Sequence, residues 1–127
     1  IPARIGGCLM VVSAGIAQLA EKCNTKDKTN SHYSIGNAWK IFKSDRKKHS
    51  SPNAAQTESA CAGALKVALS GDNYYFGKLV HKPQIGEAIR PLEAGDIGRS
   101  NILLYITAFL MVIIVLLIRL IIMLVVR

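Results

Sequence analysis

The fold class depends first on residues 101–126, which read NILLYITAFLMVIIVLLIRLIIMLVV. Apart from Asn101, Thr107 and Arg119, this stretch is nearly unbroken Ile, Leu, Val, Met and Phe. A helix of about 26 residues is about 39 Å long, enough to cross a bilayer with tilt. We therefore predict a transmembrane helix over residues 101–127. Arg119 would lie near the far boundary, either snorkelling to the headgroups or acting as a buried functional charge.

A second apolar segment lies at the other end of the chain, from Ile5 to Ala20. A helix of this length covers about 24 Å, less than the roughly 30 Å hydrocarbon core. It therefore either begins before Ile1 or packs among other helices, and its small residues suit close helix contact. We predict a membrane helix over residues 1–20.

Residues 21–50 are predicted to form a basic polar loop with one short amphipathic helix. The chain has 16 Lys and Arg against 8 Asp and Glu, a formal charge of +8, and half of the cations lie between Lys22 and Lys48. A basic loop directly after an apolar segment is typical of the cytoplasmic side of a membrane. Because no recognition motif accompanies the charge, we expect no nucleic-acid partner. Apolar residues at spacings of three and four from Ile35 to Phe42 predict the helix, with Trp39 suited to the membrane interface.

Residues 51–100 are predicted to form a helix followed by loops. Ser51 or Asn53 can cap the helix, Pro52 fits its first turn, and we expect it to end at Gly71. Residues 71–99 are rich in Gly and Pro, which leaves room only for short helical turns. The predicted fold class is therefore an all-α integral membrane protein, in which helical membrane segments flank a cytoplasmic helix-and-loop region.

Motifs of the common enzyme classes are missing from the sequence. It contains no P-loop, no dinucleotide fingerprint, no Cys/His cluster and no serine-nucleophile motif. Its three cysteines, Cys8, Cys23 and Cys61, form no close pair, which argues against a disulfide framework and a zinc site. Composition alone therefore identifies no enzyme.

A basic run occupies residues 43–49. One interpretation is a solvated run close to the membrane. The other is that Arg46, Lys47 and the lysine after it attract a phosphate group of a substrate or of ATP, since Arg binds phosphate oxygens in pairs. Asp45 and His49 would then be close enough to act on the reacting groups. Both interpretations stay open at this point.

Isolated polar residues follow the basic run. A turn of 100° per residue places Asn53 and Glu58 about 140° apart, so both cannot face one ligand from a regular helix. Glu58 could bind Mg²⁺ or polarise an amine, or it could be a first-turn acid stabilised by the helix dipole. Arg90 is the best candidate for binding a carboxylate or phosphate, whereas Asp96 either acts in the site or caps the following helix.

The order of short motifs resembles one known family. The motifs are SPNA at 51–54, a Glu five residues after the Asn, AGAL at 62–65, NYYFGKLV at 73–80, KPQIGEAIRP at 82–91 and DI at 96–97. In this order they resemble the membrane-bound adenosylcobinamide-phosphate synthases of cobalamin biosynthesis, the CbiB/CobD family. IPARIGG at 1–7 resembles a further family element, whereas residues 55–57 depart from the Gly-Trp-Pro of many members. The resemblance implies that the chain is the C-terminal part of a longer polytopic enzyme, inactive alone.

The reaction that the resemblance implies is an ATP-dependent ligation. The propionate of adenosylcobyric acid is joined to aminopropanol phosphate, or a related amino-alcohol, giving adenosylcobinamide phosphate. ATP and Mg²⁺ would be the cofactors, and the corrinoid a substrate. Further partners would be membrane lipid and the missing N-terminal part of the enzyme, with an oligomer left open. The location would be the cell membrane, as a multi-pass protein whose basic loop is cytoplasmic.

The resemblance also gives roles to the candidate site residues. The catalytic residues would be His49 as the base, Glu58 and Asp96, and the last two would also hold Mg²⁺. The substrate-binding residues would be Arg46, Lys47, Asn53, Tyr75 and Arg90. Tyr75 either packs in the core or forms a flat wall for a corrin ring or an adenine.

Two other interpretations stand beside the enzyme. One is a non-catalytic basic membrane subunit, or anchor, whose loop binds a partner or anionic lipid. The other is a truncated and inactive gene product. Because an anchor needs charge but no particular order, the ordered run from His49 to Asp96 favours the enzyme.

Overall fold

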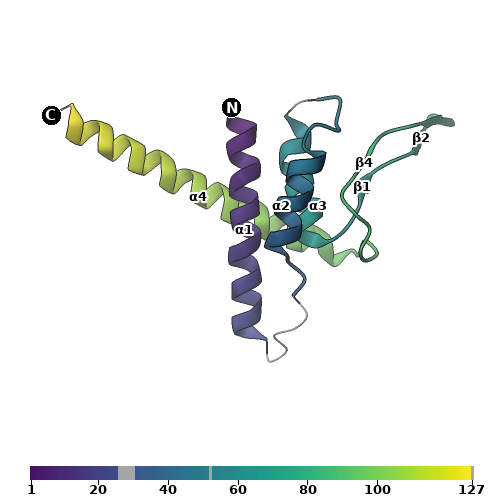
Figure 1. Ribbon diagram of the computed structural model, residues 1–127, viewed down its shortest axis with the longest axis horizontal. Coiled ribbons are helices and arrows are strands. Elements are labelled where there is room, and N and C mark those ends of the chain that lie inside the picture. Colours follow the sequence, from purple (N-terminus) through teal and green to yellow (C-terminus); the bar gives the residue numbers. More distant parts are fainter. Residues whose placement is uncertain (26–30, 52, 127) are drawn as a thin grey trace.

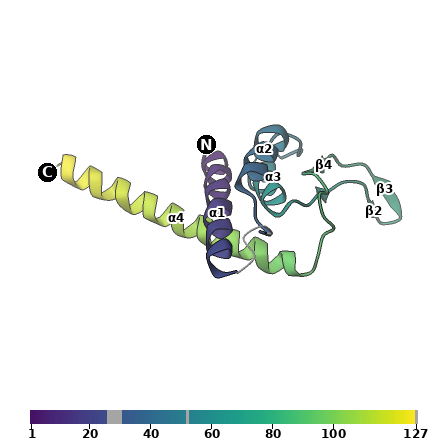
Figure 2. The same ribbon diagram turned by 60° about the horizontal axis from the view of Figure 1, so that its bottom comes forward.

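A computed structural model describes residues 1–25, 31–51 and 53–126, so the prediction for Pro52 lies outside the described residues. Three helices stand side by side, α1 (Pro2–Asn24), α2 (Ile35–Asp45) and α3 (Ala54–Leu65), and a long fourth helix, α4 (Gly95–Val125), crosses them (Figure 1). Between α3 and α4 lie four short strands: β1 (Leu69–Ser70), β2 (Asn73–Tyr75), β3 (Lys78–Val80) and β4 (Gln84–Ile85). These strands form a narrow arm that projects away from the helices (Figure 2).

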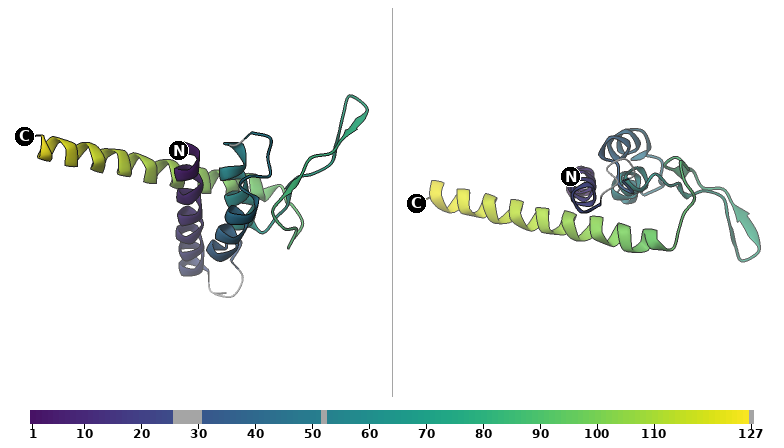
Figure 3. Two further views of the ribbon diagram at one scale, coloured as in Figure 1. Left: turned by 45° about the horizontal axis from the view of Figure 1, so that its top comes forward. Right: turned by 90° about the horizontal axis from the view of Figure 1, so that it is seen from below.

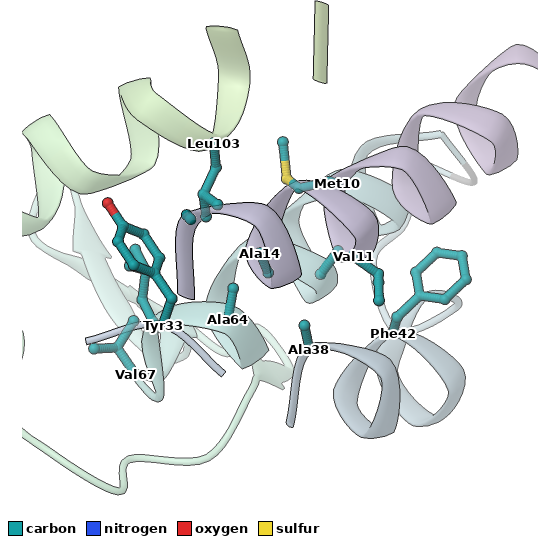
Figure 4. Close-up of a cluster of buried hydrophobic side chains, with 12 residues drawn as sticks. Met10, Val11, Ala14, Tyr33, Ala38, Phe42, Ala64, Val67 and Leu103 are labelled. Carbon is teal, nitrogen blue, oxygen red and sulfur yellow. The ribbon is translucent and has the colours of Figure 1, made fainter. Parts of the chain in front are cut away.

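The core lies where the four helices meet. Met10, Val11 and Ala14 of α1 face Ala38 and Phe42 of α2, with Ala64 of α3 and Leu103 of α4 closing the cluster (Figure 4). The small side chains among them, Ala14, Ala38 and Ala64, allow the helix backbones to come close together. The small residues predicted to support close packing in the first apolar segment therefore do so.

Helices α2 and α3 also pack closely against each other. A methyl group on Gly63 would lie 2.6 Å from the Asn37 carbonyl oxygen. The Asn37 side chain also donates a hydrogen bond to the Gly63 carbonyl, at 2.9 Å. Helix α2 begins at the cap residue Ser34, whose hydroxyl accepts from the Asn37 amide. Together these contacts hold the start of α2 against the end of α3.

The predicted end of the third helix was wrong. The helix ends at Leu65 rather than at Gly71, because Lys66 adopts a left-handed conformation with φ of 59°. The amides of Lys66 and Val67 donate to the carbonyls of Gly63 and Ala62, the pattern of a Schellman motif. Lys66 is held there because its side chain donates to the Ser31 carbonyl and its own carbonyl accepts from the Arg90 amide.

Short helical turns were also the wrong prediction for residues 71–85, and the chain is not all-α. The structure has two antiparallel ladders, β1 with β4 (Leu69 opposite Ile85) and β2 with β3 (Tyr74 opposite Leu79). The β2–β3 turn consists of Phe76 and Gly77, both with positive φ, as a two-residue hairpin of type I′ requires. Because phenylalanine is unusual at that position, residues 76–77 do not have the residue types that predict a hairpin turn.

Helix α4 carries the strongest apolar signal. Leu103 and Thr107 are buried against α1, where the hydroxyls of Thr107 and Ser13 are 2.9 Å apart. Beyond this contact the helix extends free of the body (Figure 3). The most apolar part of α4 has a mean hydropathy of 3.2, and none of it is buried. Both α1 and α4 are long and apolar enough to cross a membrane.

Candidate functional site

Two cavities lie around α3. The first, which we name the apolar pocket, has a volume of about 620 Å³ and includes Glu58, Cys61, Leu65, Ile97 and Leu104 in its lining. The second, the basic pocket, has a volume of about 500 Å³. Its lining residues are Ile1, Ala3, Arg4, Arg46, Lys47, His49, Ser50, Asn53 and Gln56.

The two pockets separate Asn53 from Glu58. Helix α3 begins at Ala54, with Asn53 at its cap position in the basic pocket and Glu58 at the apolar pocket. This agrees with the angular argument that the two side chains cannot face one ligand. Asn53 occupies the cap position, which leaves Ser51 two residues before it, but the Asn53 side chain makes no capping hydrogen bond. Glu58 lies beyond the first turn, which holds no acidic residue, so the helix-dipole interpretation of Glu58 loses its basis.

Four predicted site residues meet in the basic pocket. Arg46, Lys47, His49 and Asn53 all line it, although they come from the α2–α3 connection and the start of α3. Asp45, next to Arg46 in sequence, turns elsewhere: its carboxylate accepts from the Gly86 amide at 2.9 Å and pairs with Lys48 at 2.8 Å. Lys48 therefore pairs with Asp45, and neither residue lines the basic pocket.

Asp45 is a structural acid rather than a reacting group. Burial alone would raise the pKa of its carboxyl group, but hydrogen bonds from Lys48, the Gly86 amide and Ser44 lower it below the ordinary value. Gly86 adopts a φ of 86°, and a methyl group there would lie 2.5 Å from the Val67 carbonyl oxygen. The carboxylate thus fixes the base of the arm to α2.

The ring of His49 accepts a hydrogen bond through Nδ1 from the Ser51 amide, at 2.9 Å. In a neutral imidazole whose Nδ1 is the acceptor, the proton is on Nε2. The remaining ring nitrogen is therefore a donor. This arrangement favours contact with an anion over removal of a proton by His49.

Arg90 and Asp96 come together, but each binds the other. The Arg90 guanidinium donates to both carboxylate oxygens of Asp96, at 3.0 and 2.5 Å, and its Nε donates to the Leu65 carbonyl. Arg99 donates to the same carboxylate at 2.8 Å, and Asp96 also accepts from the Glu93 amide. This cluster links the end of α3 to the start of α4. Asp96 lies within the first turn of α4 and does not occupy its cap position, which is Ala94, so the predicted capping role was wrong.

A protein-built magnesium site does not fit these surroundings. Both oxygens of Asp96 accept hydrogen bonds from guanidinium groups, and a cation there would face two positive charges. Among the described residues, no group of three potential ligands is close enough to hold a metal ion. Glu58 is exposed and has no hydrogen bond or ion pair within the described residues. It is thus the free carboxylate of the apolar pocket.

Tyr75 lies apart from both pockets, on the arm. It is exposed, and Lys82 lies 4.6 Å from the centre of its ring and donates to its hydroxyl. Packing of Tyr75 in the core was therefore a wrong alternative. Its role as a flat wall for a ligand stays a prediction.

Sequence reasoning missed Arg4 and Cys61 as pocket residues. Arg4 is 42 positions from Arg46, and only the packing of α1 beside the α2–α3 connection brings them to one cavity. Cys61 lines the apolar pocket, where burial raises the pKa of its thiol to about 11, with a smaller contribution from Asp96. The thiol therefore stays neutral, as expected for a packing cysteine.

By its architecture the chain belongs to the class of helical proteins with apolar helices of membrane-spanning length. The family model described as CobD/Cbib protein matches residues 1–104. The cobalamin biosynthesis protein CobD of Clostridium perfringens is 44% identical over 119 residues, which cover 94% of this chain and 33% of the relative. The corresponding CobD of Desulfotalea psychrophila is 48% identical over 87 residues (68% and 26%), and the cobalamin biosynthesis protein CbiB of Salmonella typhimurium is 37% identical over 110 (87% and 30%).

These similarities decide the family: the chain belongs to the CobD/CbiB family. It spans between a quarter and a third of the length of the curated relatives that it matches. No solved structure matches it.

Proposed function

We propose that this chain acts in cobalamin biosynthesis as part of an adenosylcobinamide-phosphate synthase, in a multi-pass protein of the cell membrane. Family membership supports the pathway. The observation that carries the reaction is the free carboxylate of Glu58 at an apolar pocket, with a cationic pocket at the start of the same helix. Amide formation between a corrinoid acid and an amino-alcohol phosphate needs an apolar surface for the corrinoid and a cationic surface for the phosphate.

The proposed chemistry has two steps. A carboxylate does not condense with an amine unaided, so the γ-phosphoryl group of ATP is first transferred to the propionate oxygen and ADP leaves. The amine nitrogen then attacks the acyl carbon, and inorganic phosphate leaves. The nitrogen loses its proton to a base, for which Glu58 has a suitable free carboxylate. Cations such as Arg46 and Lys47 bind the phosphate groups.

The partners of the reaction remain proposals of the same kind. They are adenosylcobyric acid, aminopropanol phosphate or a related amino-alcohol, ATP with its Mg²⁺, and the parts of the enzyme that this chain does not represent. The same holds for the cytoplasmic position of the basic loop. Because no group of three potential ligands lies together in the described part of the chain, we assign no step to the metal.

The test is substitution of Glu58 by Gln in a chimera where this chain replaces the matching third of the Clostridium perfringens CobD. We expect product formation to fall about 10²- to 10⁴-fold, the contribution typical of a general base. Glu87→Gln is the matched control, because Glu87 is an exposed acid paired with Lys40 away from the pocket. Equal product from the Glu58 variant and the unsubstituted chimera would contradict the role of Glu58.

A further inference from the structure

The basic pocket carries positive charge without compensation. Arg4 enters it from α1, Arg46 and Lys47 from the α2–α3 connection, and no described residue of its lining is acidic. None of the ion pairs in the described part of the chain involves these three cations. A concave site of one charge attracts ligands of the opposite charge.

The guanidinium group of Arg46 is held in place, but not all of its hydrogen-bond donors have a partner among the described residues. Its guanidinium lies 5.7 Å from the centre of the Phe42 ring, a cation–π contact that limits its movement. Its Nε is buried and has no hydrogen-bond partner among the described residues. A buried donor without a partner is costly, and an anion in the pocket would supply the missing acceptor.

The start of α3 adds donors to the same pocket. Asn53, at the cap position, lines it with a side-chain amide, and Gln56 also lines it, although the Gln56 Nε2 donates to the Arg46 carbonyl. The Asn53 side chain makes no capping hydrogen bond at the start of this 12-residue helix, and the first turn has no acidic residue. The Nε2 proton of His49 adds one more donor. The positive end of the helix dipole, together with the donors of Asn53 and His49, favours an anion with several oxygen atoms.

We infer that the basic pocket binds a phosphate group, and that Arg4 is a binding residue of this site while Arg90 is not. A phosphate has enough oxygens for two guanidinium forks and a helix start at once. Arg90, by contrast, already donates hydrogen bonds to the Asp96 carboxylate and to the Leu65 carbonyl. The inference rests on the proposed function only for the molecule that carries the phosphate, which is either ATP or the amino-alcohol phosphate.

Binding to the whole chain in detergent tests this site without any need for turnover. Equilibrium dialysis would compare ATP with adenosine, and aminopropanol phosphate with aminopropanol. We expect at least one phosphorylated compound to bind more tightly than its phosphate-free partner. Arg4→Gln should weaken that binding about 10- to 100-fold, the effect of losing one or two charge-assisted hydrogen bonds. Arg4→Lys should lose less, because it keeps the charge but not the fork.

Lys43→Gln provides the matched control, because Lys43 is an exposed cation of α2 that lies over the Trp39 ring and not in the basic pocket. Arg4 is itself exposed, so neither variant should disturb the fold, and circular dichroism checks this. The compound whose binding depends on Arg4 identifies the carrier of the phosphate. The inference is overturned if neither phosphorylated compound binds preferentially, if Arg4→Gln binds like the wild type, or if Lys43→Gln loses as much. Phosphate binding without turnover in the chimera would leave this site standing and reject the proposed reaction.

Discussion

Individual charged residues divide into those that hold the fold and those left free for a ligand. Arg90 was the best sequence candidate for ligand binding, yet its donors are used within the chain. Arg4, which carried no such signal, is free in the basic pocket. The two arginines differ in their hydrogen-bond partners. A guanidinium group that already binds a carboxylate has few donors available for a substrate.

We predict that Arg90→Ala lowers stability before it affects chemistry. The side chain of Asp96 is only 5% exposed, and the variant leaves it with one guanidinium partner and removes a donor from the end of α3. Breaking such a pair should cost about 2–4 kcal/mol. Chemical denaturation in detergent measures this, and Arg90→Lys should recover little because lysine cannot form the fork. An Arg90→Ala variant that unfolds like the wild type but makes no product would restore the substrate-binding role.

Asp45 should make the stability of the chain depend on pH. Its folded-state pKa lies below the ordinary 3.8, so its contribution is present above that value and is lost as the pH falls through the folded pKa. Asp45→Asn should therefore lower the free energy of unfolding by about 1–3 kcal/mol at pH 7. The difference between variant and wild type should shrink below pH 4. A difference that stays constant down to pH 2 would show that the charge of Asp45 contributes nothing.

At the scale of the elements, sequence periodicity was informative where one residue pattern persisted. The apolar run of residues 101–126 predicted a helix that the structure contains as α4, and the spacing of apolar residues from Ile35 to Phe42 predicted α2. The end of α3 was missed because Lys66 takes a position usually filled by glycine, held by Ser31 and Arg90, which are distant in sequence. The arm was missed because Phe76 stands where a type I′ turn prefers Asn or Gly.

The same limit applies to the candidate site. Arg46, Lys47, His49 and Asn53 are neighbours in the sequence, and their grouping could be predicted from it. Joining them to Arg4 required knowing how α1 packs. That Arg90 pairs with Asp96 also depends on tertiary structure, because the connection before α4 must fold back to place the two side chains together.

The contact between α2 and α3 gives a paired prediction. Gly63→Ala should destabilise the chain by about 1–3 kcal/mol, because its methyl group would lie 2.6 Å from the Asn37 carbonyl oxygen and force the helices apart. Gly36→Ala is the control, since a methyl group there meets nothing within 4 Å. It should be neutral or slightly stabilising, as alanine favours helix. Thermal unfolding followed by circular dichroism compares the two, and similar melting temperatures would contradict the packing described here.

At the scale of the whole molecule, the chain exposes more apolar surface than a folded soluble domain would. Most of α4 beyond Thr107 contacts no other element and is as apolar as a membrane-spanning segment (Figure 3). Bilayer lipid, or the parts of the family's fold that this chain does not represent, would cover it. The apolar pocket lies where α1, α3 and the start of α4 meet, and the basic pocket lies between the start of α1 and the α2–α3 connection.

The central claim is that this chain can serve as the matching part of a CobD/CbiB enzyme. The most direct measurement is cobalamin-dependent growth of a host that lacks CobD and expresses the chimera with the Clostridium perfringens protein. We predict that the chimera restores growth, whereas the chimera with Glu58→Gln and this chain alone do not. A chimera that reaches the membrane in folded form and still makes no adenosylcobinamide phosphate would contradict the claim.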